Sequence, residues 1–278
     1  LFRSQGMCKA GGLYYTDLDN IHHYLEYGDL IAVVEPKGEI YADTIPLVET
    51  TKWKTDKLFI HSIEPMKSWI ANQSEKIKMH AVIGNYKRIA WFPNPNEEMQ
   101  LSAVRQNGSA VRFIEKPCKE VQWVAVTSNG MALKYVKDLI DKTDIHREDM
   151  YLSAVEQNGF ALQYIENPTY RMKLEAVKSN GSAIKFIVNP SEEIQLAAVK
   201  NNGSAIQYIK NPDEIIQMAA MMQCGQAIKY IKNPSVQVQL AAVSQDYNAL
   251  RFIKNPTKAI TNAALEQDPK ATNYGYNG

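Results

Sequence analysis

The chain has 278 residues, of which 45% are hydrophobic and 22% are charged, and its formal net charge at pH 7 is +1. This composition is typical of a globular protein and gives no overall attraction to nucleic acid or anionic membrane. No apolar run approaches the roughly 20 residues of a transmembrane helix, so we expect no membrane span and an intracellular location. Three widely spaced cysteines, Cys8, Cys118 and Cys224, fit a reducing compartment and no metal pattern.

Residues 1–63 lie outside the repeat that fills the rest of the chain, and their sequence predicts a small α/β module. Aromatic and β-branched residues predict a short strand at 11–16 and further strands at 30–34, 39–42 and 58–60. Between the first two strands, Asp17 or Asp19 could cap a helix over 18–27, with Gly28 ending it. We therefore divide the chain into this module, 1–63, and a repeat region, 64–278.

The sequence contains no recognisable metal-binding or phosphate-binding motif. His22 and His23 fall in the predicted helix, where adjacent side chains point about 100° apart and cannot hold one metal from one face. No glycine-rich phosphate loop, Ser/His/Asp phrase or Cys/His cluster is present in the sequence. We predict neither a metal site nor a cofactor.

An internal repeat begins near residue 75. Glycines recur every 22 residues, with one interval lengthened by seven, and an aromatic residue follows each glycine by five positions. The glycines are Gly108, Gly130, Gly159, Gly181, Gly203 and Gly225. A fixed period of this length indicates a repeat architecture.

One unit, 194–212, shows what each repeat folds into. Residues 194–202 are good helix formers, and Gly203 is expected to end that helix in the left-handed region. Ser204 would then cap a second short helix, 205–210, which Asn211-Pro212 ends. Helices this short are unstable alone, so they must pack on the next unit.

The whole chain is therefore predicted as an α+β protein, with a small α/β module followed by an α-solenoid of about nine 22-residue helix-turn-helix units. A leucine-rich repeat can share this period, but it needs a strand with Leu at alternate positions. Here Ala205, Ile206, Tyr208 and Ile209 follow helical spacing instead.

Alanine occupies one position of every unit, which suggests a close helix crossing where nothing larger fits. These residues are Ala81, Ala103, Ala125, Ala154, Ala176, Ala198, Ala220, Ala242 and Ala264. At the ends of the array the glycine position holds Tyr86, Tyr247 or Pro269, as expected for terminal repeats.

A polar position of the second helix holds a cation in five of seven units, although the chain as a whole is nearly neutral. The cations are Arg112, Lys134, Lys185, Lys229 and Arg251, with Gln163 and Gln207 in the other two units. Stacking would align them on one face, where they either bind an acidic protein or other polyanion, or form a solvated face with salt bridges to neighbouring carboxylates. The aromatic residues occupy the adjacent apolar position, which disfavours nucleic acid as the partner.

A second polar column would run along the first helices, and we interpret it as a solvated face. It comprises Gln100, Gln122, Tyr151, Lys173, Gln195, Gln217 and Gln239. The seven extra residues fall in 137–148 and predict a charged, protruding loop or an extra helical turn.

The phrase Ala-Val-x-x-Asn-Gly-x-Ala-x-x-Tyr, as at 198–208, resembles a repeat of unassigned function found in large DNA viruses and some bacteria, including Legionella-like intracellular ones. The resemblance covers roughly residues 75–275 and implies a helical repeat array in a viral or intracellular-parasite setting. The fold alone implies no activity.

The N-terminal module resembles the leader domain that precedes the repeats of many giant-virus ankyrin-type proteins. The matching phrases are 11–16, 27–28, 31–34 and 52–58. The repeats themselves lack the Thr-Pro-Leu-His signature of ankyrin. We favour a non-catalytic interaction or structural protein that acts by surface contact. The resemblance adds a setting in which it would be a virion component or an adaptor in the host cytoplasm.

An enzyme is the alternative hypothesis. Gly12-x-Tyr14-x-Thr16 resembles a strand of ADP-ribosyltransferase-type folds, which use an early basic residue, an aromatic shelf and a glutamate. Tyr14, Tyr15 and Glu64 could supply the shelf and the carboxylate, and Arg3 is the only basic candidate that we find. The repeats would then serve as a targeting arm.

Overall fold

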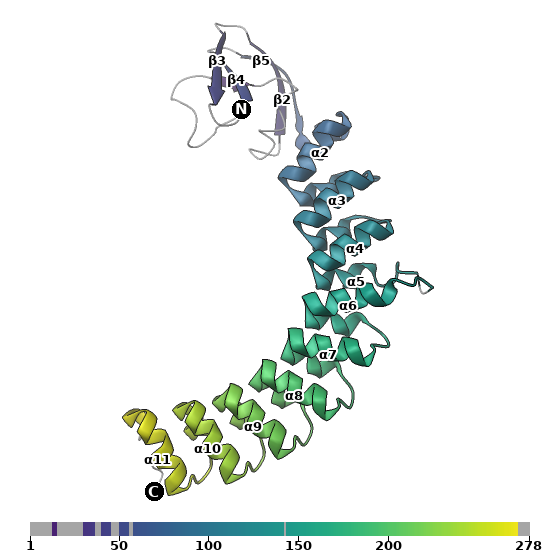
Figure 1. The fold of residues 1–278 in the computed structure, drawn as a ribbon. Coiled ribbons are helices and arrows are strands. Elements are labelled where there is room, and N and C mark those ends of the chain that lie inside the picture. The colour runs from purple at the N-terminus through teal and green to yellow at the C-terminus, as the bar shows by residue number, and fades with distance from the viewer. Residues whose placement is uncertain are drawn as a thin grey trace. The chain divides into compact units, whose positions relative to one another are not determined.

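The computed structural model, drawn in Figure 1, describes residues 13–15, 30–36, 40–45, 50–55, 58–141 and 143–271. The chain forms two compact units, Leu1–Val121 and Gln122–Gly278. Strands occupy the described part up to Pro65, and helices begin at Met66. The predicted helix 18–27, its two histidines and Cys8 lie outside the described residues.

The strands belong to two small antiparallel sheets. The first has the order β1-β4-β3, and the second pairs β2 with β5 through a register shift between Val33 and Val34. The bounds are Leu13–Tyr15 (β1), Leu30–Pro36 (β2), Ile40–Ile45 (β3), Thr50–Thr55 (β4) and Leu58–Pro65 (β5). The sequence signals at 30–34, 39–42 and 58–60 fall in β2, β3 and β5, whereas β4 has no separate signal.

From Met66 to Ala271, α-helices alternate with short 3-10 helices, labelled η, and the described residues of this region contain no strand. The α-helices are α1 Met66–Ala71, α2 Glu75–Gly84, α3 Glu97–Gln106, α4 Lys119–Ser128, α5 Leu133–Val136, α6 Arg147–Gln157, α7 Tyr170–Ser179, α8 Glu192–Asn201, α9 Glu214–Gln223, α10 Val236–Gln245 and α11 Lys258–Gln267. The 3-10 helices are η2 Tyr86–Trp91, η3 Gly108–Phe113, η4 Gly130–Ala132, η5 Gly159–Tyr164, η6 Gly181–Phe186, η7 Gly203–Tyr208, η8 Gly225–Tyr230, η9 Tyr247–Phe252 and η10 Pro269–Ala271. The helical repeat predicted from the sequence is confirmed, and the leucine-rich alternative is wrong.

Within the second unit, each α-helix from α6 to α11 packs on the next, and each 3-10 helix from η4 to η9 packs on the next. Figure 1 shows α6 to α11 side by side, coloured green to yellow. Every repeat buries the same apolar positions. In the repeat formed by α8 and η7 these are Ile194, Val199, Ala205 and Ile206. Each helix pair therefore buries one face against its neighbours, and the core runs the length of the stack.

The second helix of a repeat begins differently from our prediction. Ser204 is not its cap: Asn202 is both the C-cap of α8 and the N-cap of η7, and its Oδ1 accepts a hydrogen bond of 3.0 Å from the Ser204 amide. The backbone of Asn202 is extended (φ −145°, ψ 105°), and this ends the α-helix. The helix that follows is a 3-10 helix of six residues.

The left-handed residues lie elsewhere in the repeat. Gly203 and its equivalents in the second unit have no positive φ. Among the described residues other than glycine, the positive φ values, 49–51°, belong to four asparagines that precede prolines, namely Asn189, Asn211, Asn233 and Asn255. Asparagine tolerates this conformation better than most residues because its short polar side chain can hydrogen-bond locally. The prediction that glycine ends the first helix in a left-handed conformation is therefore wrong.

The glycine is required by contact with the next repeat instead. A Cβ at Gly203 would lie 2.5 Å from the carbonyl oxygen of Ala220, and a Cβ at Gly159 would lie 2.1 Å from that of Ala176. Gly130, Gly181 and Gly225 meet Ala154, Ala198 and Ala242 in the same way. All nine alanines of the repeated position are 0% exposed. The close crossing predicted from alanine therefore exists, and glycine forms its other half.

A polar side chain of the next repeat pairs with the amide of each glycine. The Gly225 N–H donates to Gln245 Oε1 at 2.6 Å, and the Gly181 N–H donates to Asn201 Oδ1 at 2.7 Å. Asn201 also donates through Nδ2 to the Lys178 carbonyl at 2.8 Å. One side chain thus satisfies a buried donor and an exposed helix-end carbonyl of the preceding repeat.

A second hydrogen bond between repeats joins the N-terminal ends of consecutive α-helices. The capping residue of one helix donates to the first glutamate of the preceding helix: Asn96 to Glu75 at 3.0 Å, and Ser235 to Glu214 at 2.5 Å. Cys118 occupies the same position and its thiol lies 3.6 Å from Glu97 Oε1. Cys118 therefore fills a repeat position, and Cys224 likewise replaces the asparagine cap between α9 and η8.

The extra residues lie between α5 and α6, in turns rather than in an added helix. Leu139 and Ile145 are 49% and 84% exposed there, and Asp141 accepts a hydrogen bond from the Thr143 amide. The predicted protruding loop is confirmed for the residues described.

Gly203→Ala is expected to destabilise the second unit, because the new methyl group would overlap backbone atoms that cannot rotate away. Overpacking of this kind costs roughly 1–3 kcal/mol. The exposed Gly84, in the last turn of α2, is the control, since alanine there should be neutral or stabilising. Thermal melts followed by circular dichroism measure both, and equal melting temperatures would contradict the close contact.

Gln245→Ala is expected to cost about 1–3 kcal/mol, because it leaves the buried Gly225 N–H without its acceptor. Gln207, whose side chain is exposed, provides the matched control, and its change to alanine should cost within about 0.5 kcal/mol. Urea unfolding of the two variants compares them directly, and similar midpoints would show that solvent replaces Gln245 without loss.

Candidate partner-binding surface

The cations singled out in the sequence are exposed residues of the short second helices. In the second unit, equivalent positions of neighbouring, mutually packed helices hold Lys134, Gln163, Lys185, Gln207, Lys229 and Arg251. We call these six residues the basic row. All six are exposed. Arg112, which is also exposed, holds the same position of η3 in the first unit.

The aromatic residues beside the basic row also reach the surface. Tyr135, Tyr208 and Tyr230 are 38%, 41% and 40% exposed. In η7 the buried residues are Gly203, Ala205 and Ile206, so the aromatic residue Tyr208 lies outside the core. The sequence interpretation that placed these rings in an apolar position beside the row is therefore wrong.

The cations of the row lie against the faces of these rings. Lys185 Nζ is 4.9 Å from the centroid of Phe186 and 4.8 Å from that of Phe160 in the neighbouring repeat. Lys229 likewise lies 5.0 Å from Tyr230 and 5.6 Å from Phe252. Such contacts are attractive because the ring face carries partial negative charge. The lysines are thus held between repeats by neutral groups, and their charges are not neutralised.

The other cations follow the same pattern with one ring each. Arg112 lies 4.5 Å from the Phe113 centroid, Lys134 lies 5.7 Å from Tyr135, and Arg251 lies 4.6 Å from Phe252. Among the described residues, ion pairs join Lys78 to Glu75, Lys137 to Asp138, His146 to Asp149 and Lys178 to Glu175. Within this part of the chain none of the five cations forms a salt bridge, so the salt-bridged alternative is not observed.

A hydrogen-bond network borders the row at its C-terminal end. Arg251 donates to Gln226 Oε1 at 3.2 Å, and Gln226 Nε2 donates to Asp246 Oδ2 at 2.6 Å. Burial raises the pKa of Asp246, but hydrogen bonds from Gln226 and Asn248 and the charge of Arg251 together outweigh it and lower that pKa below its ordinary value. Asp246 is therefore ionised at neutral pH and fixes Gln226 against Arg251.

The second polar column is not a solvated face. Gln195, Gln217 and Gln239 are half-buried, and each donates through Nε2 to the carbonyl of the proline five residues earlier, at 2.8–2.9 Å. Gln122 is only 7% exposed. These side chains stabilise the Asn-Pro turns through hydrogen bonds. The interpretation of this column as a solvated face is therefore wrong.

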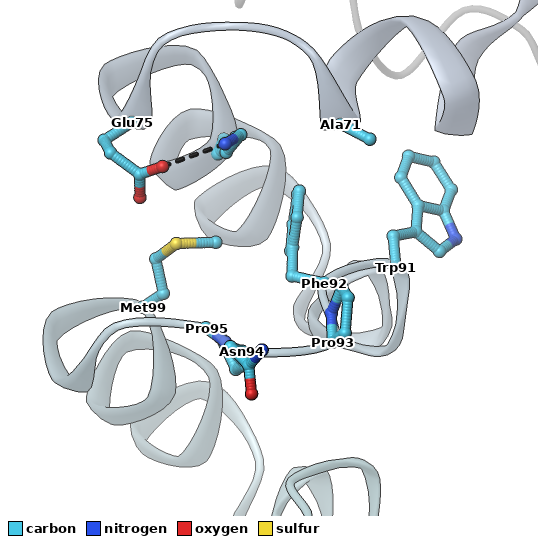
Figure 2. A pocket seen from close by; sticks show the side chains of 9 residues that line it. Ala71, Glu75, Trp91, Phe92, Pro93, Asn94, Pro95 and Met99 are labelled. Atoms are coloured by element: carbon cyan, nitrogen blue, oxygen red, sulfur yellow. Dashed lines mark hydrogen bonds and ion pairs between the residues drawn. The ribbon is translucent and has the colours of Figure 1, made fainter.

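A cavity of about 200 Å³ lies in the first unit between α2, η2 and α3. Figure 2 shows Trp91, Phe92 and Met99 around it, together with the ion pair of Glu75 and Lys78. Its volume is below the roughly 300–1,000 Å³ typical of ligand pockets. Its carboxylate, Glu75, is paired with Lys78 and Asn96.

The residues of the enzyme hypothesis are spread over separate elements. Tyr14 and Tyr15 belong to β1, in the β1-β4-β3 sheet, whereas Glu64 belongs to β5, in the β2-β5 pair. Arg3 lies outside the described residues. In the described part of the chain no three metal-ligating side chains gather at one site. Nor does any helix there have the length and apolar character needed to cross a bilayer.

Comparison with known proteins finds no match to this chain among protein-family models, curated proteins or solved structures.

Acid should weaken the fold through Asp246, because a carboxyl group with a lowered pKa in the folded protein stabilises it only while ionised. That contribution is present above its ordinary pKa of about 4 and is lost as pH falls through the folded-state pKa. Asp246→Asn introduces the residue that other repeats carry here, and it should remove this pH dependence. Melting temperatures of parent and variant, measured from pH 7 to pH 3, should converge on acidification. A constant difference would contradict the assignment.

Proposed function

We propose that this protein is a non-catalytic interaction protein whose helical repeats bind an acidic partner along the basic row. The observation that carries the proposal is the state of the cations. Lys185 and Lys229 lie on aromatic rings, are exposed, and form no salt bridge among the described residues.

The ordering of the side chains supports binding rather than simple solvation. A free lysine loses up to about 2 kcal/mol of rotamer entropy when a partner immobilises it. Lysines already held on ring faces have lost part of that freedom before the partner arrives, so the surface is preorganised. The repeat packing keeps the spacing of the cations constant, because each 3-10 helix is fixed by the glycine–alanine contact.

The repeat region and the N-terminal module have different roles in this proposal. The repeats provide the binding surface, and residues 1–63 are the small α/β module predicted from the sequence, in keeping with the leader domain that they resemble. The viral or intracellular-parasite setting rests on the resemblance of the repeat phrase alone. In that setting the protein would act as a virion component or as an adaptor in the host cell.

Partner capture tests the proposal. The variant Lys185→Gln, Lys229→Gln, Arg251→Gln removes three charges of the row together with their ring contacts, which contribute about 0.5–1 kcal/mol each. Circular dichroism should therefore show a modestly lowered melting temperature and a folded variant at the assay temperature. Immobilised parent protein should retain partners from cells that express it at about 0.15 M salt and lose them at about 1 M. The triple variant should lose the same partners at low salt.

The matched control is Arg171→Gln, Lys200→Gln, Lys258→Gln, which removes the same charge from exposed positions of α7, α8 and α11. This control should capture the same partners as the parent. If the row variant also retains them all, the basic row is not the binding surface.

A further inference from the structure

The rings of the basic row are partly covered by the cations. Lys185 lies over Phe186 and Phe160, whose rings also meet edge to face with centroids 6.0 Å apart. Lys229 is held in the same way by Tyr230 and Phe252. A nucleic acid base binds by stacking on an open ring face, and here it would have to displace these cations. A carboxylate needs only the cation, which is already in place.

Phenol groups supply further donors beside the cations. Tyr135, Tyr164, Tyr208 and Tyr230 occupy the position next to the row, and their hydroxyl groups have no hydrogen-bond partner in the described residues. A phenol O–H donates to a carboxylate in a short, charge-assisted bond. The surface therefore offers a cation, a hydroxyl donor or both at every position of the row, and each of these groups binds carboxylates.

The repeat spacing restricts how the carboxylates can be arranged. Packed helices lie roughly 8–10 Å apart, and we take this value as the expected spacing of neighbouring positions of the row. In the polyproline II conformation the chain rises about 3.1 Å per residue with three residues per turn. Every third side chain then points to the same side at a spacing of about 9 Å, which matches the row.

We propose that the basic row binds a segment in the polyproline II conformation that carries an Asp or Glu at every third residue. This inference rests on the proposed function and adds the conformation and spacing of the partner to it. Each carboxylate faces one position of the row. It meets a cation alone at Lys185 and Arg251, a tyrosine hydroxyl alone beside Gln163 and Gln207, and both groups at the other two positions. The segment lies across the repeats, parallel to the direction in which η5 to η9 stack.

A synthetic peptide with one Glu-Pro-Pro triplet for each of the six positions of the row tests this proposal. Its control has the same composition, with all the glutamates clustered at one end. Fluorescence anisotropy of labelled peptides against the full-length protein should give at least roughly tenfold tighter binding for the periodic peptide, equivalent to about 1.4 kcal/mol. Oligothymidylate of the same residue count is the third probe.

Three protein variants complete the design. The row variant K185Q/K229Q/R251Q should bind the periodic peptide roughly tenfold more weakly, whereas R171Q/K200Q/K258Q should bind it within about twofold of the parent. Tyr208→Phe with Tyr230→Phe keeps the rings and removes two hydroxyl groups. It should weaken the periodic peptide severalfold and leave the clustered peptide unaffected.

The outcomes separate this inference from the proposed function. Equal affinity for the periodic and clustered peptides would overturn the spacing argument. Tighter binding of oligothymidylate than of either peptide would overturn the carboxylate preference. In both cases, loss of partner capture by the row variant would still support the basic row as the binding surface. Retention of capture by that variant would remove the proposed function as well.

Discussion

The contact between a glycine of one repeat and an alanine of the next sets the geometry of the second unit. A Cβ on any of the five glycines would fall 2.1–2.5 Å from an alanine carbonyl oxygen, so the backbones touch without intervening side chains. Such contact fixes the distance and orientation of neighbouring helix pairs more tightly than side-chain packing would. The polar bridge from residues such as Gln245 then satisfies the glycine amide that this approach buries.

Much of this arrangement follows from the sequence, because a repeat displays its constraints many times. The period, the alternating helices and the close crossing at Ala198 and its equivalents were predicted from spacing alone. The role of Gly203 was not, since glycine is compatible both with a left-handed turn and with close approach, and only the neighbouring repeat distinguishes them. Asn211, before Pro212, carries the left-handed turn, whereas Asn202, before Gly203, is extended. The usual preference of a residue before proline is extended, so local rules would not have predicted this assignment.

The candidate surface was likewise predicted only in part from the sequence. The sequence placed cations at equivalent positions, and the stacked second helices of the second unit confirm that Lys185, Lys229 and Arg251 are exposed. Whether the neighbouring rings face the core depends on the helix type. A six-residue α-helix would distribute its side chains differently from the 3-10 helix observed, and the spacing of apolar residues in so short a segment does not discriminate between them. The cation–ring contacts between repeats follow from that difference.

The loop between α5 and α6 shows that chain length and packing are separable in this architecture. A Cβ on Gly130 would lie 2.2 Å from the Ala154 carbonyl oxygen, within the range of the other glycine–alanine pairs, although the loop adds seven residues between them. The connection can therefore lengthen while the register of the stack is kept, since extra loop residues cost little entropy beyond closure. For protein engineering, this connection is a permissive insertion point. A reporter or a second binding module placed there would leave the helices on either side in contact.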